Sequence, residues 1–358
     1  MVFSHILIEW YERNKRDLPW RHTSDPYKIW VSEVILQQTR VAQGLEYYLN
    51  FTETFPTVYS LAEADIDRVL KVWQGLGYYT RARNMHATAK YIVDNLGGVF
   101  PSSYSGLIQL KGIGDYTASA IAAFAFREPV AAVDGNVYRI FARVFGVETP
   151  IDTSKGKAEL KAIASSMLDV ERPHIYNQAI MDFGGTLCMP KNPRCYECPV
   201  LEMCSAFRNR TVDDLPVKSK KVKQTIRYFT YIIPENRGKT FISKRSKSDI
   251  WHSLYEFPLV ESERQLTIEE LVKDESWLSL FGDTMPEIVH VSSPAKYVLS
   301  HQKIFAQFVV VKVATVSPVL EQAYSQINFD EIHEYSTPRL IEGYLAAEPV
   351  EKYFKRNV

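Results

Sequence analysis

The sequence predicts a multidomain protein of two fold classes: an all-α domain over residues 1–209, a linker over 210–226, and a smaller α/β domain over 227–358. The chain has 358 residues, more than one hydrophobic core usually organises. Up to about residue 209 the apolar residues recur at helical spacing between short Gly and Pro turns, whereas strand-like runs follow the linker. The linker is polar, with Pro216 among lysines and acids.

The first domain begins with an amphipathic helix, because Phe3, Leu7 and Trp10 follow a helical repeat. Capping and turn residues at 23–26 then predict a single helix over about 27–51. Similar apolar periods predict further helices over 60–73, 81–96, 102–110, 116–126 and 135–145.

The second domain mixes strands with helices. Strands are expected over 226–233, 240–244 and 303–313, where β-branched and aromatic residues gather. Helical patterns interrupt them at about 268–281 and 338–347. This alternation favours an α/β or α+β domain.

Composition sets limits on location and on charge. A hydrophobic content of 46% and a charged content of 23% are typical of a soluble globular protein. No apolar run approaches the roughly 18 residues of a membrane helix, and the start lacks the basic region of a signal peptide. We therefore expect an intracellular protein in a reducing compartment. Because the net charge is zero, any nucleic-acid affinity must come from local basic patches.

All four cysteines fall in one window, spaced C-x6-C-x2-C-x5-C: Cys188, Cys195, Cys198 and Cys204. An intracellular chain argues against two disulfides. Structural zinc is a better alternative, although zinc sites usually bring two close C-x2-C pairs. Four thiolates spread along such a loop favour an iron–sulfur cluster.

A glycine hairpin precedes the cysteines, in Leu-Lys-Gly-Ile-Gly-Asp-Tyr at residues 110–116. Gly112 and Gly114 allow a tight turn between two helices, and exposed amides at the start of the next helix can hold a phosphate. A plain turn between helices is the alternative, because GxG alone is a weak signal.

Two acids are candidates for catalysis. Asp134 precedes an expected helix, so it either caps that helix or places a carboxylate where positive charge develops on a sugar. Glu33 is a lone acid in an apolar helical stretch, and the pattern alone favours an exposed position. If buried, Glu33 would have a raised pKa and could act as a general acid.

The cysteine spacing, the hairpin and the segment SEVILQQT at 32–39 together resemble the MutY-type adenine DNA glycosylases of the endonuclease III superfamily. The resemblance covers 1–209 and continues more weakly through 210–358. It implies a helix-hairpin-helix domain and one [4Fe–4S] cluster per chain, held by the four cysteines in a loop at 188–204. It also implies phosphate-backbone contacts from Lys111, Gly112, Gly114, Lys191 and Arg194.

The same resemblance implies roles in the reaction. Glu33 would protonate adenine, Asp134 would stabilise the sugar cation, and Tyr116 and Asn136 would position these groups. Tyr116 replaces the lysine of lyase-active relatives and cannot form an imine, so a monofunctional enzyme is expected. The implied substrate contacts are Arg21 and Gln178 around adenine, with Gln38 and Tyr78 inside the duplex.

The second domain resembles the Nudix-like domain with which MutY enzymes recognise 8-oxoguanine. Hydrolysis of nucleotides is not expected, because the Glu-rich metal helix of Nudix hydrolases is missing after 254–258. Leu299-Ser300-His301 matches the family's Phe-Ser-His loop at Ser300 and His301, while a surface turn is the alternative. Leu299 replaces the family's aromatic, so the polar contacts of Ser300 and His301 are expected without a stacking ring at that position.

The expected function is therefore release of adenine paired with 8-oxoguanine or guanine in double-stranded DNA, by a monomer in the bacterial cytoplasm at the nucleoid. One alternative is a lyase-active glycosylase for oxidised pyrimidines, which Tyr116 and the second domain both oppose. The other is a non-catalytic iron–sulfur DNA-binding module, which the presence of both Glu33 and Asp134 opposes.

Overall fold

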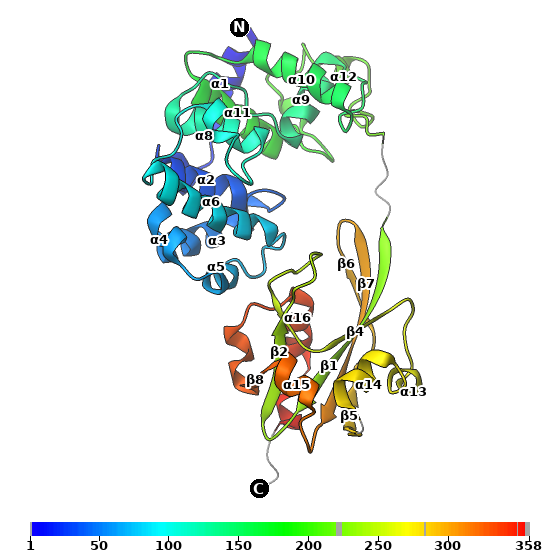
Figure 1. Cartoon of the computed structure of the whole chain (residues 1–358). Helices are drawn as coiled ribbons and strands as arrows, with labels where there is room; N and C mark the ends of the chain where they lie inside the picture. Colours follow the sequence, from blue (N-terminus) through cyan, green and yellow to red (C-terminus); the bar gives the residue numbers. More distant parts are fainter. Residues whose placement is uncertain (1, 220–223, 283, 349, 355–358) are drawn as a thin grey trace. The chain divides into compact units, whose positions relative to one another are not determined.

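A computed structural model describes residues 2–219, 224–282, 284–348 and 350–354. The chain forms two compact units, Met1–Ala64 with Thr80–Lys221 and Asp65–Tyr79 with Val222–Val358 (Figure 1). Residues 220–223 of the expected linker lie outside the described residues. Within the described residues, no helix has the length and apolar character needed to cross a bilayer.

The first unit is all-α, as the sequence predicts (Figure 1). Its apolar core joins the N-terminal helix to helices far along the chain, because α1 packs against α11 and α9 packs against both α10 and α11. Separately, α2 packs against α8, which brings the SEVILQQT segment to the end of the hairpin. Its elements are α1 (Val2–Asn14), η1 (Pro19–Arg21), α2 (Pro26–Ile35), α3 (Val41–Thr54), α4 (Val58–Glu63), α6 (Thr80–Leu96), α7 (Tyr104–Leu107), α8 (Asp115–Phe126), α9 (Gly135–Phe145), α10 (Ser154–Met167), α11 (Pro173–Thr186), η2 (Cys195–Glu197) and α12 (Ser205–Arg208).

Two predicted helices are each divided in the structure. The helix expected over 27–51 ends at Ile35 and restarts at Val41, because Gln38 between them has a left-handed φ of 59°. The helix expected over 60–73 is broken at the extended residue Ala64, where Asp65 caps the following helix through the amide of Asp67. Apolar periodicity continues across both breaks and therefore could not reveal them.

The second unit is built on a mixed sheet in the order β4-β1-β7-β5, with β6 also paired to β7, beside a small antiparallel sheet β3-β2-β8. Alternate residues of β1 point to opposite faces, so Phe229 and Tyr231 pack beneath α16 and Ile232 packs beneath α14 and α15. This α/β architecture confirms the predicted fold class (Figure 1). Its elements are α5 (Ile66–Val72), β1 (Thr225–Glu235), β2 (Lys239–Lys244), β3 (Tyr255–Glu256), β4 (Leu259–Ser262), α13 (Ile268–Leu271), α14 (Glu275–Phe281), β5 (Glu287–Val291), β6 (Ala295–Val298), β7 (Gln302–Lys312), α15 (Pro318–Ala323), β8 (Ser325–Asn328), η3 (Phe329–Glu334), α16 (Arg339–Ala347) and η4 (Val350–Tyr353).

The runs of β-branched and aromatic residues located the long strands of this unit within one or two residues. The expected strands at 226–233, 240–244 and 303–313 are β1, β2 and β7. The helix expected over 268–281 is two helices, because Asp274 caps α14 through the amide of Ser276.

Candidate active site

Most of the predicted site residues of the first unit line one cleft, which is about 1360 Å³ in volume. Its walls come from η1, α2, the hairpin, α8, α9 and α11. The predicted site residues that line it are Arg21, Glu33, Gln38, Gly112, Gly114, Tyr116, Asp134, Asn136, Gln178 and Lys191.

Glu33 lies in α2 with only 6% of its surface exposed. This is the buried position that the resemblance of residues 32–39 implies, and not the exposed position that the apolar pattern alone favours. Burial raises the pKa of Glu33 to about 7, assisted by the charge of Asp134 and opposed by a hydrogen bond from Tyr116 and the charge of Arg21. Near neutral pH a substantial share of this carboxyl is therefore protonated. A protonated carboxyl in a cleft can act as a general acid.

Tyr116 holds this carboxyl in place. Its hydroxyl donates to Glu33 Oε2 at 2.7 Å and contacts Met181 Sδ at 3.7 Å. Burial and the neighbouring carboxylates raise the pKa of Tyr116 well above its ordinary value, so the phenol stays neutral and remains a donor.

Asp134 caps α9 and also faces the cleft. Its Oδ1 accepts from the amides of Asn136 (2.8 Å) and Val137 (2.9 Å), and its Oδ2 accepts from Asn136 Nδ2 at 2.7 Å. Burial raises the pKa of Asp134, while these hydrogen bonds and the charge of Arg139 act in the opposite direction. The two interpretations of Asp134 are therefore compatible in space.

The four cysteine side chains line one cavity beside α9. Arg143, 2% exposed, donates to Cys188 Sγ at 3.5 Å and to the Met189 carbonyl at 2.8 Å. Arg139 connects the same region to the cleft, since it donates to the Cys188 carbonyl (2.9 Å) and to Asn136 Oδ1 (2.9 Å). Among the described residues, no three His, Cys, Asp or Glu side chains are grouped to hold a single metal ion.

Two buried guanidinium groups beside four thiols suit an anionic group bound in that cavity, because buried charges require compensation. The donor set therefore fits a thiolate-bound metal cluster.

The hairpin between α7 and α8 has the geometry that its glycines predict. Gly112 has a left-handed φ of 76°, and a Cβ there would lie 2.6 Å from Asn84 Cβ. Gly114 caps α8 and faces open space, so a ligand can approach its backbone closely. Lys111 is exposed, and its carbonyl accepts a hydrogen bond from Thr88.

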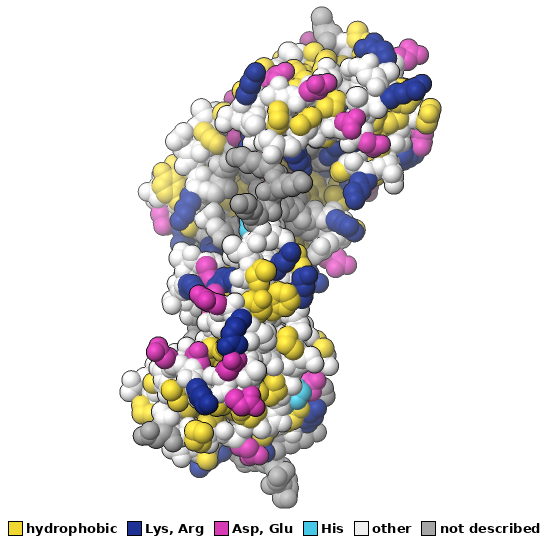
Figure 2. Space-filling model, turned by 90° about the vertical axis from the view of Figure 1, so that its right-hand side faces the viewer, with side chains coloured by type: hydrophobic (Ala, Val, Ile, Leu, Met, Phe, Trp, Pro, Cys, Tyr) yellow, Lys and Arg dark blue, Asp and Glu magenta, His cyan; other side chains and the backbone are white. Residues whose placement is uncertain are grey.

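The basic residues of the cysteine loop differ in their partners. Lys191 is exposed at the cleft, whereas Arg194 forms an ion pair with Glu197. Basic and acidic side chains are interspersed on the face shown in Figure 2. That distribution agrees with the net charge of zero, so affinity for DNA has to come from individual basic side chains and backbone amides near the cleft.

Sequence reasoning missed two residues that organise the adenine-pocket candidates. Asp182 is fully buried on α11 and accepts from Arg21 Nη1 (2.7 Å) and Nη2 (2.6 Å), and Arg21 in turn lies over the ring of Tyr11. The Tyr11 hydroxyl donates to Gln178 Oε1 at 2.7 Å. Although burial alone would raise the pKa of Asp182, Arg21 and Arg16 hold it below its usual value. A lone acid in an apolar helix, the signal that identified Glu33, could have identified Asp182.

In the second unit, Ser300 and His301 are exposed in the turn between β6 and β7, so the surface-turn description is correct as geometry. The backbone of this turn is tied to the start of β1, because Thr225 donates its amide to the His301 carbonyl at 2.9 Å. Tyr78 belongs to the same unit and is 48% exposed, and its hydroxyl forms a hydrogen bond with the Ser300 hydroxyl.

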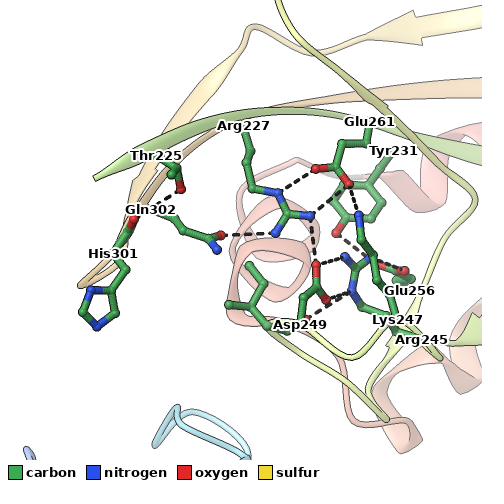
Figure 3. A network of polar contacts seen from close by, with 11 residues as sticks. Thr225, Arg227, Tyr231, Arg245, Lys247, Asp249, Glu256, Glu261, His301 and Gln302 are labelled. Carbon is green, nitrogen blue, oxygen red and sulfur yellow. Dashed lines mark hydrogen bonds and ion pairs between the residues drawn. The ribbon is translucent and has the colours of Figure 1, made fainter. Parts of the chain in front are cut away.

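An ion network fixes the strand that follows this turn (Figure 3). Arg227 on β1 donates to Gln302 Oε1 at 3.2 Å and also bonds Glu261 and Asp249. Asp249 is shared with Arg245, whose side chain is nearly buried. Gln302, the residue after His301, is thus fixed in position by its hydrogen bond with Arg227.

Two family models match the two units of the chain. The HhH-GPD superfamily base excision DNA repair protein model matches residues 31–165, and the NUDIX domain model matches residues 229–347.

Curated relatives and solved structures agree with these matches. The chain is 34% identical over 274 residues to the adenine DNA glycosylase of Buchnera aphidicola subsp. Schizaphis graminum, covering 76% of this chain and 79% of that one. It is 40% identical over 214 residues to the human adenine DNA glycosylase, covering 57% of this chain and 39% of the human protein. Among solved structures, a thermostable thymine-DNA glycosylase matches at 26% identity with a TM-score of 0.54, over 58% of this chain and 96% of its own. Endonuclease III in a non-covalent DNA complex matches at 21% identity with a TM-score of 0.51, over 58% of this chain and 95% of its own, which shows a shared fold.

Proposed function

The chain belongs to the adenine DNA glycosylase family and is a DNA glycosylase of base-excision repair, and we propose that it releases adenine paired with 8-oxoguanine or guanine. The observation that carries the proposal is the buried Glu33 carboxyl, hydrogen-bonded to Tyr116 in a cleft shared with Asp134. Adenine inside a duplex cannot reach such a cleft, so the reaction requires base flipping.

Glu33, protonated because of burial, donates its proton to N7 of the flipped adenine. The glycosidic bond then breaks with its electron pair leaving on the base, and the sugar becomes oxocarbenium-like. The Asp134 carboxylate stabilises this cation, and Asn136 fixes the orientation of that carboxylate. Ionised Glu33 finally accepts a proton from the water that attacks the sugar.

Tyr116 favours a monofunctional reaction. Its hydroxyl is committed to Glu33, and a phenol cannot form a Schiff base with the sugar. Water is therefore the final nucleophile, and the product is an abasic site with both strands intact.

Recognition of the opposite base falls to the second unit in this proposal. Ser300 and His301 are exposed on an anchored turn, and their side chains can hydrogen-bond a base edge. Tyr78 presents an exposed ring that can stack within the opened duplex, and Gln38 lies at the cleft to enter beside the flipped adenine. Arg21 and Gln178 contact the adenine itself.

Single-turnover cleavage of duplexes that differ only in A:8-oxoguanine, A:G, A:C or A:T tests the proposal. We expect release from the first two pairs, fastest opposite 8-oxoguanine. Ser300→Ala with His301→Ala should reduce the advantage of A:8-oxoguanine over A:G by about tenfold, because each base-edge contact contributes about 1–3 kcal/mol. Ser325→Ala, an exposed serine on β8, is the control. Equal losses on both pairs would exclude a role in reading the oxidised base.

DNA-backbone contacts are assigned to the hairpin and the cysteine loop. Amides at Gly112 and Gly114 and the positive end of α8 can bind one phosphate, with Lys111 beside them. Lys191 and Arg194 would bind the backbone at the loop, Arg194 after exchanging Glu197 for a phosphate.

The cysteine cavity is proposed to hold one [4Fe–4S] cluster, through Cys188, Cys195, Cys198 and Cys204. When bound, the cluster supplies cross-links that keep the loop at 188–204 folded. Arg143 and Arg139 contribute positive charge next to the thiolates.

Purified protein should contain about four iron atoms per chain and absorb visible light. Cys198→Ser should lower iron content and melting temperature together, because the ligand loop is part of the scaffold. Elemental analysis and thermal melting measure both quantities. Stoichiometric zinc in place of iron would contradict the cluster and favour a tetrahedral zinc site.

A monomeric state and a nucleoid-associated location in the bacterial cytoplasm remain predictions of the proposal. Sedimentation on and off DNA measures the first, and imaging in cells measures the second.

A further inference from the structure

The segment between α2 and α3 joins the catalytic helix to a residue proposed to enter DNA. Glu33 lies in α2, which ends at Ile35, and Gln38 follows after one short turn. Gln38 is exposed at the cleft and has a left-handed φ of 59°. A residue with a side chain adopts this conformation only where its surroundings impose it.

Arg81, from the start of α6, closes the end of α2. Its Nη1 donates to the carbonyl oxygens of Val34 (2.6 Å), Ile35 (3.3 Å) and Gln37 (2.8 Å). The last carbonyls of a helix lack amide partners within the helix, and a guanidinium also interacts favourably with the negative end of the helix dipole. The half-buried guanidinium of Arg81 thus contacts the backbone at the end of α2.

The bond to Gln37 has a direct consequence for Gln38. The Gln37 carbonyl belongs to the peptide plane that extends to the Cα of Gln38. The N–Cα bond of Gln38 lies at the edge of this plane, so holding the Gln37 oxygen limits rotation about φ of Gln38. A second contact, from Gln37 Nε2 to Thr117 Oγ1 at 3.3 Å, ties the same residue to α8.

We propose that Arg81 is a positioning residue that holds the Gln37–Gln38 peptide in its left-handed turn before DNA arrives, so that the Gln38 side chain is preorganised to enter the duplex. This inference rests on the role of Gln38 in the proposed function. Preorganisation lowers the conformational cost at the moment of base flipping. Arg81 acts through Gln38 and does not contact the reacting atoms.

The test is a double-mutant cycle between Arg81→Met and Gln38→Gly, measured as single-turnover adenine release from an A:G duplex. Arg81→Met keeps the side-chain stem and removes the donors, so the rate constant should fall by about tenfold, as for loss of one charge-assisted hydrogen bond. Glycine adopts a left-handed φ freely and has no side chain to place. In the Gln38→Gly background, Arg81→Met should therefore cost about twofold or less.

Lys90→Met is the control, because Lys90 is an exposed cation on the same helix. Its rate should match that of the unaltered enzyme. Arg81→Lys, which keeps one cationic donor, should retain part of the rate and shows that the loss does not come from misfolding.

Equal costs of Arg81→Met in both backgrounds would overturn the inference, as would an equal loss in Lys90→Met. If Gln38→Gly alone leaves the rate unchanged, the proposed role of Gln38 fails and the inference fails with it. If Gln38→Gly is slow but Arg81→Met is not, the inference alone fails.

Discussion

Glu33→Gln is expected to lower the rate constant of adenine release by about 10²- to 10⁴-fold, while the affinity for the duplex is retained. Glutamine fills the same space and can still accept the hydrogen bond from Tyr116, but it has no acidic proton for the base. Single-turnover kinetics and a binding titration on one A:8-oxoguanine duplex separate the two effects. Glu46→Gln, an exposed acid on α3, is the control and should leave both unchanged. A variant at position 33 with an unaltered rate constant would exclude Glu33 as the acid.

The pH dependence of the rate follows from the same carboxyl. Its pKa is raised to about 7, and the protonated form is the catalyst, so ionisation of Glu33 should make the rate fall above pH 7. The fall should approach about tenfold per pH unit. Burial raises the pKa of Asp134, which must be ionised, so the rate should also decline on the acid side. Residual activity of Glu33→Gln should lack the alkaline decline.

Asp134→Asn is expected to slow adenine release by about 10²- to 10³-fold without destabilising the protein. Asparagine caps helices as well as aspartate does, so α9 should keep its first turn. The amide, however, carries no charge to stabilise the sugar cation. A single-turnover rate combined with a melting curve therefore separates catalysis from capping.

Asp25→Asn provides the matched comparison for Asp134. Asp25 caps α2 through the amide of Tyr27 at 2.9 Å, with no part in the walls of the cleft. Both variants should melt like the unaltered protein, and only Asp134→Asn should be slow. If both keep the full rate, Asp134 is a helix cap and the cation requires another partner.

The sequence located the elements whose evidence is local. Runs of β-branched and aromatic residues identified β1 and β7, and the glycine spacing identified the hairpin, where Gly112 does require a left-handed φ. The cysteine spacing, taken with 32–39, was sufficient to indicate the family, because a motif is read from the order of residues without knowledge of packing. The roles of individual site residues still depend on the experiments above.

The ends of helices were harder to predict from the sequence than their existence. The helix expected over 27–51 has an apolar period that runs through the break, and the group that closes α2 is Arg81, more than forty residues later. A contact between residues so distant in the chain leaves no trace in either local pattern.

The resemblance of residues 32–39 pointed to Glu33 as an acid, but the groups that surround it come from tertiary structure. Its pattern favoured solvent, yet packing of α2 against α8 buries it and brings Tyr116 within 2.7 Å. Asp182, which the sequence analysis did not single out, is buried on α11 and pairs with Arg21 from a separate segment. A sequence specifies that a helix carries an acid and how its apolar residues repeat. The pKa of that acid depends on which neighbours replace water around it, and only the folded chain determines those neighbours.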